Sequence, residues 1–383
     1  MKKIILIICI LFLFVLFPKN NEVKAEKEEL RGIFISYIEE QRYLSKDQEK
    51  SKAKINKMIE NVKKNKFNLI ILQVRSASDA IYDSNIFPWS SVLTGVEGEE
   101  YFDVLDYFIK ESHSNNIKLY AWINPYRVRT NTNVESISDK NPAYKYLDTD
   151  TIYINNGIYY NPSKKEVEDL IVNGVEEIVK NYEVDGILFD DYFYPDDQID
   201  INDYNEYIKT NPYINLKDYH LMIVNKMVKR THEICEKYKV EFGISPDGNI
   251  NNNYESIYAD IYTWLNSDEY IDYIMPQIYY GFFNEKMPFY QTIKEWDNAI
   301  KNNSIKLMIA LALYKSGNVD KYAKSGSEEW IKNNDIIKRE IMLSRNLKHY
   351  EGFSLFRYDN LFTEGVINES SKLEFENLKK ILH

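Results

Sequence analysis

Residues 184–195 read VDGILFDDYFYP, an apolar run that leads directly into two acids flanked by aromatic rings. Because side chains alternate along a strand, Ile187 and Phe189 are expected on one face and Leu188 and Asp190 on the other. The run therefore predicts a short strand with a pair of carboxyl groups at its C-terminal end. In proteins built of βα repeats, that end of the strand carries the active site.

Runs of this kind recur along the chain, separated by segments with helical periodicity. Strand and helix alternation repeated eight times predicts an α/β protein with a (β/α)8 TIM barrel. An open doubly wound sheet is the alternative, but no G-x-G-x-x-G turn follows the first run. The eight predicted strands are residues 31–36, 68–74, 117–124, 185–190, 240–245, 271–279, 305–314 and 351–358.

The third predicted strand is followed by the longest non-helical connection, residues 125–162. A long loop on the catalytic face of a barrel usually builds substrate subsites, so we expect this one to do so. The helix after it has a predicted capping box, because Ser163 and Glu166 have the S-x-x-E spacing and apolar residues then repeat at helical intervals.

Residues 1–25 have the organisation of a secretory signal peptide: a basic start, an apolar run over residues 4–17 and a small-residue cleavage site ending at Ala25. The alternative is an uncleaved anchor, but the run is shorter than the roughly 20 residues that a bilayer crossing needs. We therefore expect one barrel domain over residues 26–383, exported to the medium or the cell envelope, without stable membrane insertion after processing.

The charge and the cysteines exclude some functions. The formal net charge is −11, and removal of residues 1–25, which hold four lysines and one acid, makes it −14. Nucleic acid is therefore not an expected partner. Only Cys235 remains after processing, so no internal disulfide can form, and its place on the apolar face of a predicted helix indicates a buried, inert thiol.

The acid pair after the fourth predicted strand suits glycosidic cleavage. That reaction needs one carboxylic acid to protonate the leaving oxygen and one carboxylate to attack or to activate water. Asp190 and Asp191 are therefore the candidate catalytic residues. A structural role in a helix cap or loop is the alternative, because neighbours on a strand face opposite ways and only one of them need reach a cleft. Other candidates for the second acid are Glu39, Asp247 and Asp359.

Polar and aromatic residues follow nearly every other predicted strand, as a saccharide cleft requires. Planar polar groups can hydrogen-bond sugar hydroxyls or acetamido groups, and aromatic faces can stack on sugar rings. Arg75 is also expected to keep the catalytic carboxylate ionised by charge pairing. The candidate substrate-binding residues are Glu39, Arg75, Asp79, Trp89, Asn124, Arg127, Tyr192, Asp247, Gln277 and Tyr279.

Other chemistries have little support in the sequence. The five histidines show neither H-x-H nor H-E-x-x-H spacing, so we predict no metal site. A G-x-S-x-G elbow, the signature of a serine esterase, is not found either. No cofactor is expected.

Several of these segments together resemble the glycosyl-hydrolase-like 10 family, in order from about residue 30 to 315. The segments that carry the resemblance are Arg31-Gly32, Gln73-Val74-Arg75 with Asp79-Ala80 and Tyr82, Pro88-Trp89-Ser90 with Leu93-Thr94-Gly95, residues 122–128 (WINPYRV), residues 184–195, residues 242–246 (FGISP) and Pro276-Gln277-Ile278-Tyr279.

The resemblance implies a secreted or envelope-bound TIM-barrel glycoside hydrolase that acts on cell-wall glycan. By this resemblance, Asp190 and Asp191 occupy the family's acidic pair. The family's polar cleft positions correspond to Arg75, Asp79, Asn124, Arg127 and Gln277. The chain departs from the family in two places. Residues 33–35 stand where many members have a tryptophan, and residues 247–250 replace a more aromatic block, which puts the sugar preference there in doubt and makes Asp247 a local contributor.

The leading hypothesis is an exported glycosidase that cleaves β-linked amino-sugar polymers, with the glycan strands of peptidoglycan as the first candidate substrate. The negative net charge expected after processing is a mild objection to this hypothesis, since an acidic protein is not attracted electrostatically to an anionic wall. One alternative is an inactive, lectin-like barrel that binds wall glycan. Another is a glycosidase for a different polysaccharide.

Overall fold

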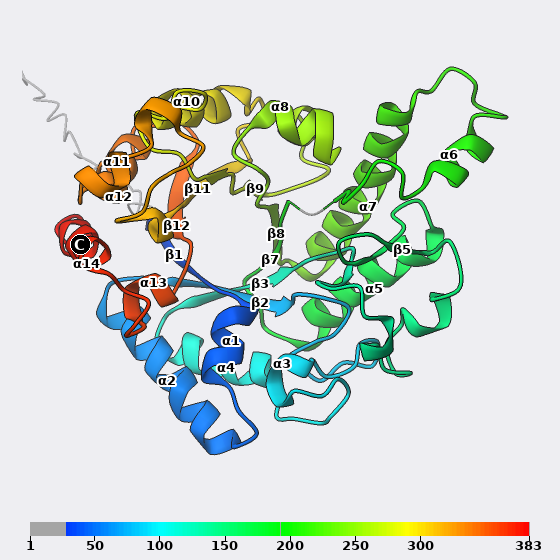
Figure 1. Ribbon diagram of the computed structural model, residues 1–383, viewed down its shortest axis with the longest axis horizontal. Coiled ribbons are helices and arrows are strands. Elements are labelled where there is room, and N and C mark those ends of the chain that lie inside the picture. Colours follow the sequence, from blue (N-terminus) through cyan, green and yellow to red (C-terminus); the bar gives the residue numbers. More distant parts are fainter. Residues whose placement is uncertain (1–27, 192, 383) are drawn as a thin grey trace, which may run out of the picture.

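The computed structural model describes residues 28–191 and 193–382, and a closed parallel barrel forms its centre (Figure 1). The predicted signal peptide and Tyr192 therefore lie outside the described residues. The barrel strands are β1 (Leu30–Ile35), β2 (Leu69–Arg75), β3 (Lys118–Ile123), β7 (Gly186–Phe189), β8 (Glu241–Ile244), β9 (Tyr273–Ile274) with β10 (Gln277–Ile278), β11 (Lys306–Leu311) and β12 (Tyr350–Leu355).

Strand pairing closes the barrel. The order runs β1-β2-β3-β7-β8-β9, and β11 pairs with β9 and β10 on one side and with β12 on the other, which returns to β1. Each of the eight predicted strands coincides with a barrel position, so the predicted (β/α)8 fold is confirmed. The sixth position is split into β9 and β10, because Pro276 has no N–H to donate to a neighbouring strand.

Helices surround the barrel, and along the chain they connect one barrel strand to the next (Figure 1). The longer ones are α2 (Gln48–Lys64), α4 (Val104–Ser114), α5 (Lys165–Asn181), α7 (Leu216–Tyr238), α10 (Phe289–Ala299), α12 (Ile336–Ser344) and α14 (Glu369–Lys379). The shorter ones are α1 (Tyr37–Tyr43), α3 (Ser91–Thr94), α6 (Ile201–Tyr207), α8 (Ile250–Asn252), α9 (Ile261–Trp264), α11 (Glu329–Lys332) and α13 (Asp359–Phe362), with single turns η1 (Val134–Ser136), η2 (Tyr144–Tyr146), η3 (Asn253–Ile257), η4 (Leu313–Lys315) and η5 (Lys324–Gly326).

Alternation along the strands produces two separate apolar layers. On β7, Ile187 and Phe189 belong to the large outer core between strands and helices, whereas Leu188 belongs to the barrel interior. The interior is otherwise filled by side chains such as Phe34, Tyr120 and Trp122. The facing predicted for this strand is therefore confirmed, and it directs the side chain after Phe189 toward the mouth of the barrel.

The long connection after β3 carries a small sheet of its own. Its strands β4 (Arg127–Arg129), β5 (Ile152–Ile154) and β6 (Ile158–Tyr160) pair antiparallel in the order β4-β6-β5. The capping box predicted after this segment is wrong, because α5 begins at Lys165 and Lys164 stands at its N-cap. The hydroxyl of Ser163 donates instead to Asn161 Oδ1, which also accepts the Ser163 N–H, so a local turn captures the side chain.

Cys235 is fully buried on α7, and burial raises the pKa of its thiol, which confirms the prediction of an inert residue. Among residues 28–191 and 193–382, no helix has both the length and the apolar character needed to cross a bilayer.

Candidate active site

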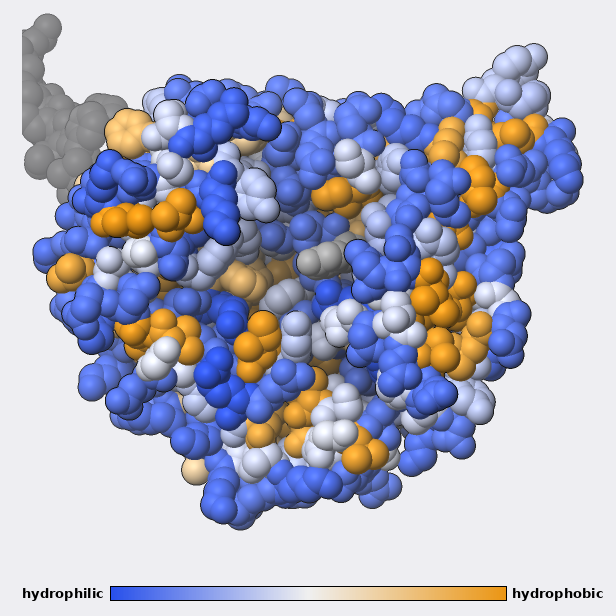
Figure 2. Space-filling model, in the orientation of Figure 1, coloured by the Kyte–Doolittle hydropathy of each residue, from blue (hydrophilic) through white to orange (hydrophobic). Residues whose placement is uncertain are grey.

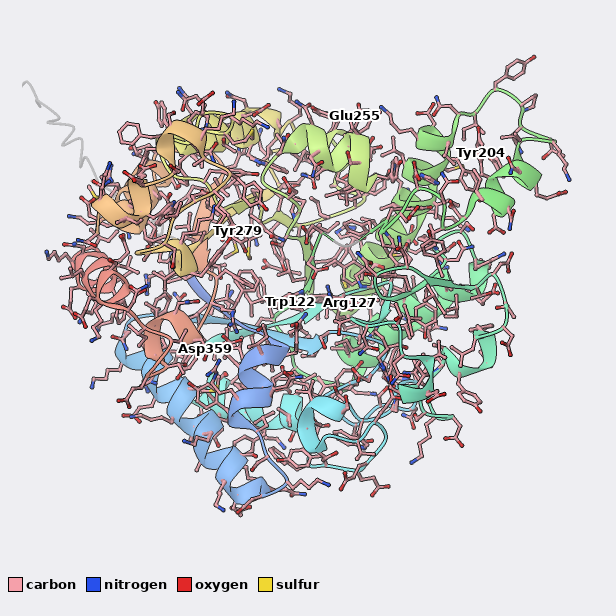
Figure 3. The ribbon with its side chains drawn as sticks, viewed as in Figure 1. Trp122, Arg127, Tyr204, Glu255, Tyr279 and Asp359 are labelled. Atoms are coloured by element: carbon pink, nitrogen blue, oxygen red, sulfur yellow. The ribbon has the colours of Figure 1, made fainter. Side chains whose placement is uncertain are left out.

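A cavity of about 310 Å³ opens at the C-terminal ends of the barrel strands. Figure 2 shows this face of the molecule hollowed near its centre, and Figure 3 places Trp122, Arg127 and Tyr279 around the hollow. The volume lies at the lower end of the roughly 300–1,000 Å³ typical of small-ligand sites. The lining residues are Phe34, Ser36, Tyr37, Ile38, Gln73, Trp122, Arg127, Asp190, Asp191, Ser245, Gln277, Tyr279 and Phe356.

Both predicted catalytic acids line this cavity. Asp190 continues the inward-facing row of β7, as its parity with Leu188 requires. Asp191 would face away if the strand continued, but β7 ends at Phe189 and the chain bends at Asp191, which lines the cavity. The end of the strand thus allows two adjacent carboxyl groups to share one cleft.

Asp190 is held by donors from the neighbouring strand. Trp122 Nε1 donates to its Oδ2 over 3.0 Å, and Asn124 Nδ2 donates to the same oxygen. Trp122 and Asn124 are two residues apart, so they project from the same side of the chain at the end of β3. These two N–H donors fix the position of one carboxyl oxygen of Asp190.

The orientation of the Asn124 amide follows from its other contacts. Its Oδ1 accepts hydrogen bonds from Gln73 Nε2 at 2.6 Å and from Arg127 Nη2 at 2.7 Å. Gln73 is held in turn, because its Oε1 accepts the backbone N–H of Tyr37. With its carbonyl oxygen occupied by donors, Asn124 must present its NH2 group to Asp190. Residues from three strand ends therefore cooperate to hold one carboxylate.

Asp191 has a different environment. Burial raises the pKa of its carboxyl group to about 6, and the charge of Asp247 acts in the same direction. Hydrogen bonding to its own backbone N–H and to Gln277, whose Nε2 lies 3.2 Å from Oδ1, opposes this rise, as does the charge of Arg127. A carboxyl group with such a pKa keeps its proton in mildly acidic solution and can donate it.

One wall of the cleft is aromatic. Trp122 and Phe34 pack edge to face with ring centroids 5.5 Å apart, and Phe356 lies 5.6 Å from Phe34. Tyr279 joins this cluster at 5.9 Å from Phe356. These rings come from four different strand ends and form an apolar cup beside the acids.

Arg75 does not lie in the cleft, and the expected charge pairing with the catalytic acid is wrong. Its guanidinium sits 3.8 Å above the ring of Phe87, next to Gly174 of α5, between the barrel and its helices. The cause is a shift in the pairing of β2 with β3, where Gln73 is opposite Trp122 but Arg75 is opposite Ile123. The extra residue, Val74, turns Arg75 to the outer face.

Glu39 is fully buried and has a structural role in the barrel. It caps its own helix by accepting the backbone N–H of Ser36, and it also accepts the N–H of Asp359. Arg357 lies 2.7 Å from its carboxylate. Glu39 and Asp359, both considered as second acids, thus join the ends of β1 and β12 and do not line the cleft.

Three further predicted residues, Trp89, Asp247 and Asp79, do not belong to the lining of the cleft. Trp89 borders a different surface depression with Pro88 and Lys140. Asp247 accepts the backbone N–H of Asn249 and forms an isolated bridge with Gln277, and its charge raises the pKa of Asp191. Asp79 lines a second cavity beside the first one.

Several residues that line the cleft were not among those predicted from the sequence. Ser36, Tyr37, Gln73 and Phe356 were read as parts of strand ends and not chosen as site residues. Strand parity could have identified Gln73, because it stands two residues beyond the interior-facing Ile71. Tyr37 gave no such signal, since it lies in the first turn of α1 and its place depends on how that helix packs.

The part of the chain that the structure describes has no cluster of three or more histidine, cysteine or acidic side chains placed to hold a metal ion. The cleft therefore presents two carboxyl groups, amide and guanidinium donors, and aromatic rings. Together these can protonate one oxygen atom while they face a developing positive charge with a carboxylate.

Comparison with known proteins identifies relatives along most of the chain. Glycosyl hydrolase YngK of Bacillus subtilis (strain 168) is 34% identical over 362 residues, which cover 87% of this chain and 69% of that protein. Glycosyl hydrolase DigH of Escherichia coli (strain K12) is 30% identical over 323 residues, 77% of this chain and 72% of that protein.

Solved structures with the same fold include the PgaB (BpsB) glycoside hydrolase domain from Bordetella bronchiseptica, with a TM-score of 0.60 and 12% identity over 92% of this chain and 99% of that domain. A family 20 exo-β-N-acetylglucosaminidase from Vibrio harveyi has a TM-score of 0.53 and 8% identity over 91% of this chain and 54% of that one. Residues 29–328 match the family described as glycosyl hydrolase-like 10. The chain therefore belongs to the glycosyl hydrolase-like 10 family and is a glycoside hydrolase.

Proposed function

We propose that this protein is an exported glycosidase that hydrolyses β-linked amino-sugar glycans, with the glycan strands of peptidoglycan as its first substrate. The observation that carries the proposal is the pair of carboxyl groups in unlike surroundings within one cleft. Asp190 accepts two N–H donors, whereas burial raises the pKa of Asp191 to about 6. Export rests on the sequence of residues 1–25.

The proposed reaction divides the work between the two acids. Asp191, protonated in mildly acidic solution, donates its proton to the glycosidic oxygen as the bond to the anomeric carbon breaks. The carboxylate of Asp190 faces the positive charge that develops on the sugar ring. A water molecule then adds to the anomeric carbon, and the proton it loses returns to the carboxylate of Asp191. Arg127 and Gln73 act through Asn124, whose amide they hold in the orientation that donates to Asp190.

The aromatic cup supports an amino sugar. Phe34, Trp122, Tyr279 and Phe356 meet beside the acids, and their rings exclude water from that part of the cleft. An acetamido group carries a methyl group that such a cup can bury, with a gain of roughly 0.8 kcal/mol per buried carbon. A sugar with a plain hydroxyl at that position would gain nothing there.

The test is the release of reducing ends from peptide-stripped peptidoglycan glycan by purified protein. Asp190→Asn is expected to abolish release while the melting temperature and circular dichroism stay those of wild type. The matched control is Asp268→Asn, an exposed acid outside the cleft, which should keep full activity. Equal activity of wild type and Asp190→Asn would overturn the assignment.

Two other outcomes of this assay would favour the alternative functions. Binding of the glycan without turnover by wild type would favour the lectin-like barrel. Turnover of another polysaccharide, with none of amino-sugar glycan, would retain the glycosidase and replace the substrate.

A further inference from the structure

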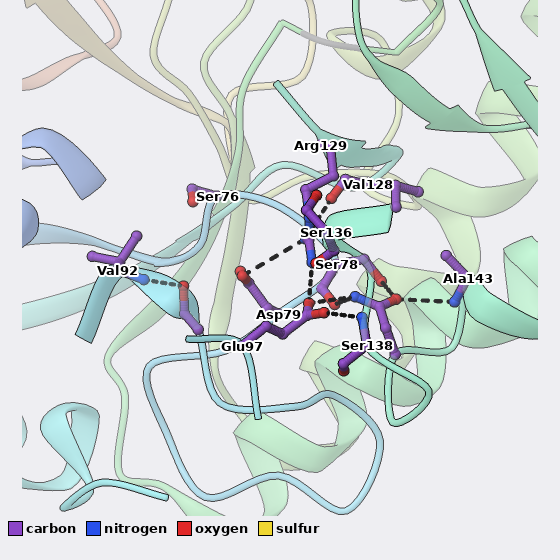
Figure 4. Close-up of polar contacts among 12 residues, drawn as sticks. Ser76, Ser78, Asp79, Val92, Glu97, Val128, Arg129, Ser136, Ser138 and Ala143 are labelled. Carbon is purple, nitrogen blue, oxygen red and sulfur yellow. Dashed lines mark hydrogen bonds and ion pairs between the residues drawn. The ribbon is translucent and has the colours of Figure 1, made fainter. Parts of the chain in front are cut away.

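A second cavity, of about 440 Å³, lies next to the cleft of the two acids. Tyr37 lines both cavities, so its side chain marks the boundary between them. Figure 4 shows the polar contacts around the floor of the second cavity. The lining residues are Tyr37, Gln41, Ser76, Ala77, Asp79, Ser91, Val92, Gly95, Val96, Glu97, Arg129, Thr130, Asn131 and Ser136.

The strand β4 explains why the two cavities are neighbours. Arg127 and Arg129 are two residues apart, with Val128 between them buried in the outer core. Arg127 lines the first cavity and Arg129 the second. Residues at this spacing on a strand lie roughly 7 Å apart. Arg127 also donates from Nε to the carbonyl of Ser76, a residue of the second cavity. One short strand therefore supplies a cation to each cavity.

The floor of the second cavity is an ordered group of charges. Arg129 Nη2 pairs with Glu97, whose other oxygen accepts the Ser138 N–H at 2.6 Å, and Asn141 donates to Glu97 at 2.7 Å (Figure 4). The side chains of Arg129 and Glu97 are 10% and 4% exposed. Glu97 reaches this position because Gly95 ends α3 with φ at +87°, a turn that favours glycine.

Asp79 adds a third charge to this floor. Its carboxylate lies 3.8 Å from Arg129 Nη1 and also interacts with Ser90 and the Ser91 backbone. The Glu97–Arg129 pair is already neutral, so an ionised Asp79 leaves the floor with one unbalanced negative charge. Burial raises the pKa of the Asp79 carboxyl group to about 6, and the charge of Arg129 opposes this rise. The remaining lone pairs of Asp79 can accept hydrogen bonds from a ligand.

We propose that the second cavity is a distal subsite that binds a further sugar residue of the same glycan, with Asp79 accepting hydrogen bonds from the hydroxyl or amide N–H groups of that sugar. The proposal rests on the function proposed above. The glycan then passes across Tyr37, from the cleft of Asp190 and Asp191 to the floor of Asp79, Glu97 and Arg129.

The walls of the second cavity fit this ligand. They combine small apolar surfaces, at Val92 and Val96, with the hydroxyl and amide groups of Ser91, Thr130 and Asn131. That mixture suits a sugar, which has both apolar faces and a rim of hydroxyls. A chain of sugars that occupies both cavities binds more tightly than a short one, so the enzyme should prefer long substrates.

The experiment measures affinity and turnover for β-linked N-acetylglucosamine oligomers from the disaccharide to the hexasaccharide. Affinity is measured by calorimetry in the Asp191→Asn background, so that no substrate is consumed, and turnover is measured in the active protein. Val96→Trp fills the subsite from its exposed rim, since Val96 is 55% exposed. The matched control is Val319→Trp, an equally exposed valine (52%) that lines neither cavity.

We expect the ratio of hexasaccharide to disaccharide affinity to fall about tenfold in Val96→Trp and to be retained in Val319→Trp. Asp79→Asn should lower the same ratio. An unchanged ratio in both subsite variants would overturn the proposal, as would a wild-type affinity that does not rise with chain length. Oligomer binding that depends on Val96, without turnover by the active protein, would support the subsite and overturn the proposed hydrolysis.

Discussion

The ends of β7 and β2, which flank β3 in the barrel, carry similar sequence signals with different outcomes. Each strand ends at a charged residue that the sequence assigned to the cleft: Asp190 follows β7, and Arg75 ends β2. On β7 the alternation of side chains continues and Asp190 reaches the cavity. On β2 one extra residue turns Arg75 outward, against Phe87 and α5. A charge at a strand end is therefore a functional signal only while the register with the next strand is unbroken.

The largest expected effect is at the β7 end. Asp191→Asn removes the proton donor, so kcat on glycan should fall by about 10²- to 10⁴-fold. The loss should be much smaller on an aryl glycoside, whose phenolate leaves without protonation. Steady-state kinetics on both substrates provides the measurement. Equal losses on the two would assign Asp191 a role other than that of the acid.

A substitution that disturbs the packing of Arg75 at the β2 end should lower the stability of the protein and leave catalysis unchanged. At Gly174 of α5, a Cβ atom would lie 2.3 Å from Arg75 Nη1 and 2.8 Å from the Phe87 ring. We expect Gly174→Ala to lower the free energy of unfolding by about 1–3 kcal/mol through overpacking, with kcat unchanged. Denaturant unfolding gives the value.

The neighbouring substitution Asn173→Ala, at an exposed position of the same helix, is the control. It should be neutral or slightly stabilising, because alanine favours helix more than asparagine does. If Gly174→Ala proved as stable as Asn173→Ala, the packing of Arg75 against α5 would be looser than the contacts indicate.

The smallest effect concerns the pH dependence of the β7 end. Catalysis needs Asp191 protonated, so kcat/KM should fall about tenfold per pH unit above about 6. Asp247 raises the pKa of Asp191 by its charge, while Arg127 and Gln277 lower it. In Asp247→Asn the raising charge is lost, the pKa falls, and the descending limb of the profile should move to lower pH. If the descending limb stays in place or moves to higher pH, the charge of Asp247 does not raise the pKa of Asp191.

Much of the site was predictable because it follows strand parity. Asp190 and Gln277, chosen from the ends of predicted strands, line the cleft, whereas Asn124, predicted to bind substrate, does not. Asn124 nevertheless acts by holding Asp190, a role visible only once Gln73 and Arg127 are seen to donate to its oxygen. Glu39 had the same signal as Asp190 but joins β1 to β12, because Arg357 and Asp359 meet it there.

The amino-acid sequence by itself determined where the eight strands lie and which of their side chains face the barrel interior, because both depend on local apolar runs and on a period of two residues. Only the tertiary structure decided that Arg75 leaves the cleft, that Asp191 shares it with Asp190, and that Arg129, Glu97 and Asp79 meet in a second cavity. Those outcomes depend on the register with a strand far away in the chain and on where each strand stops, and neither property is encoded in any single segment.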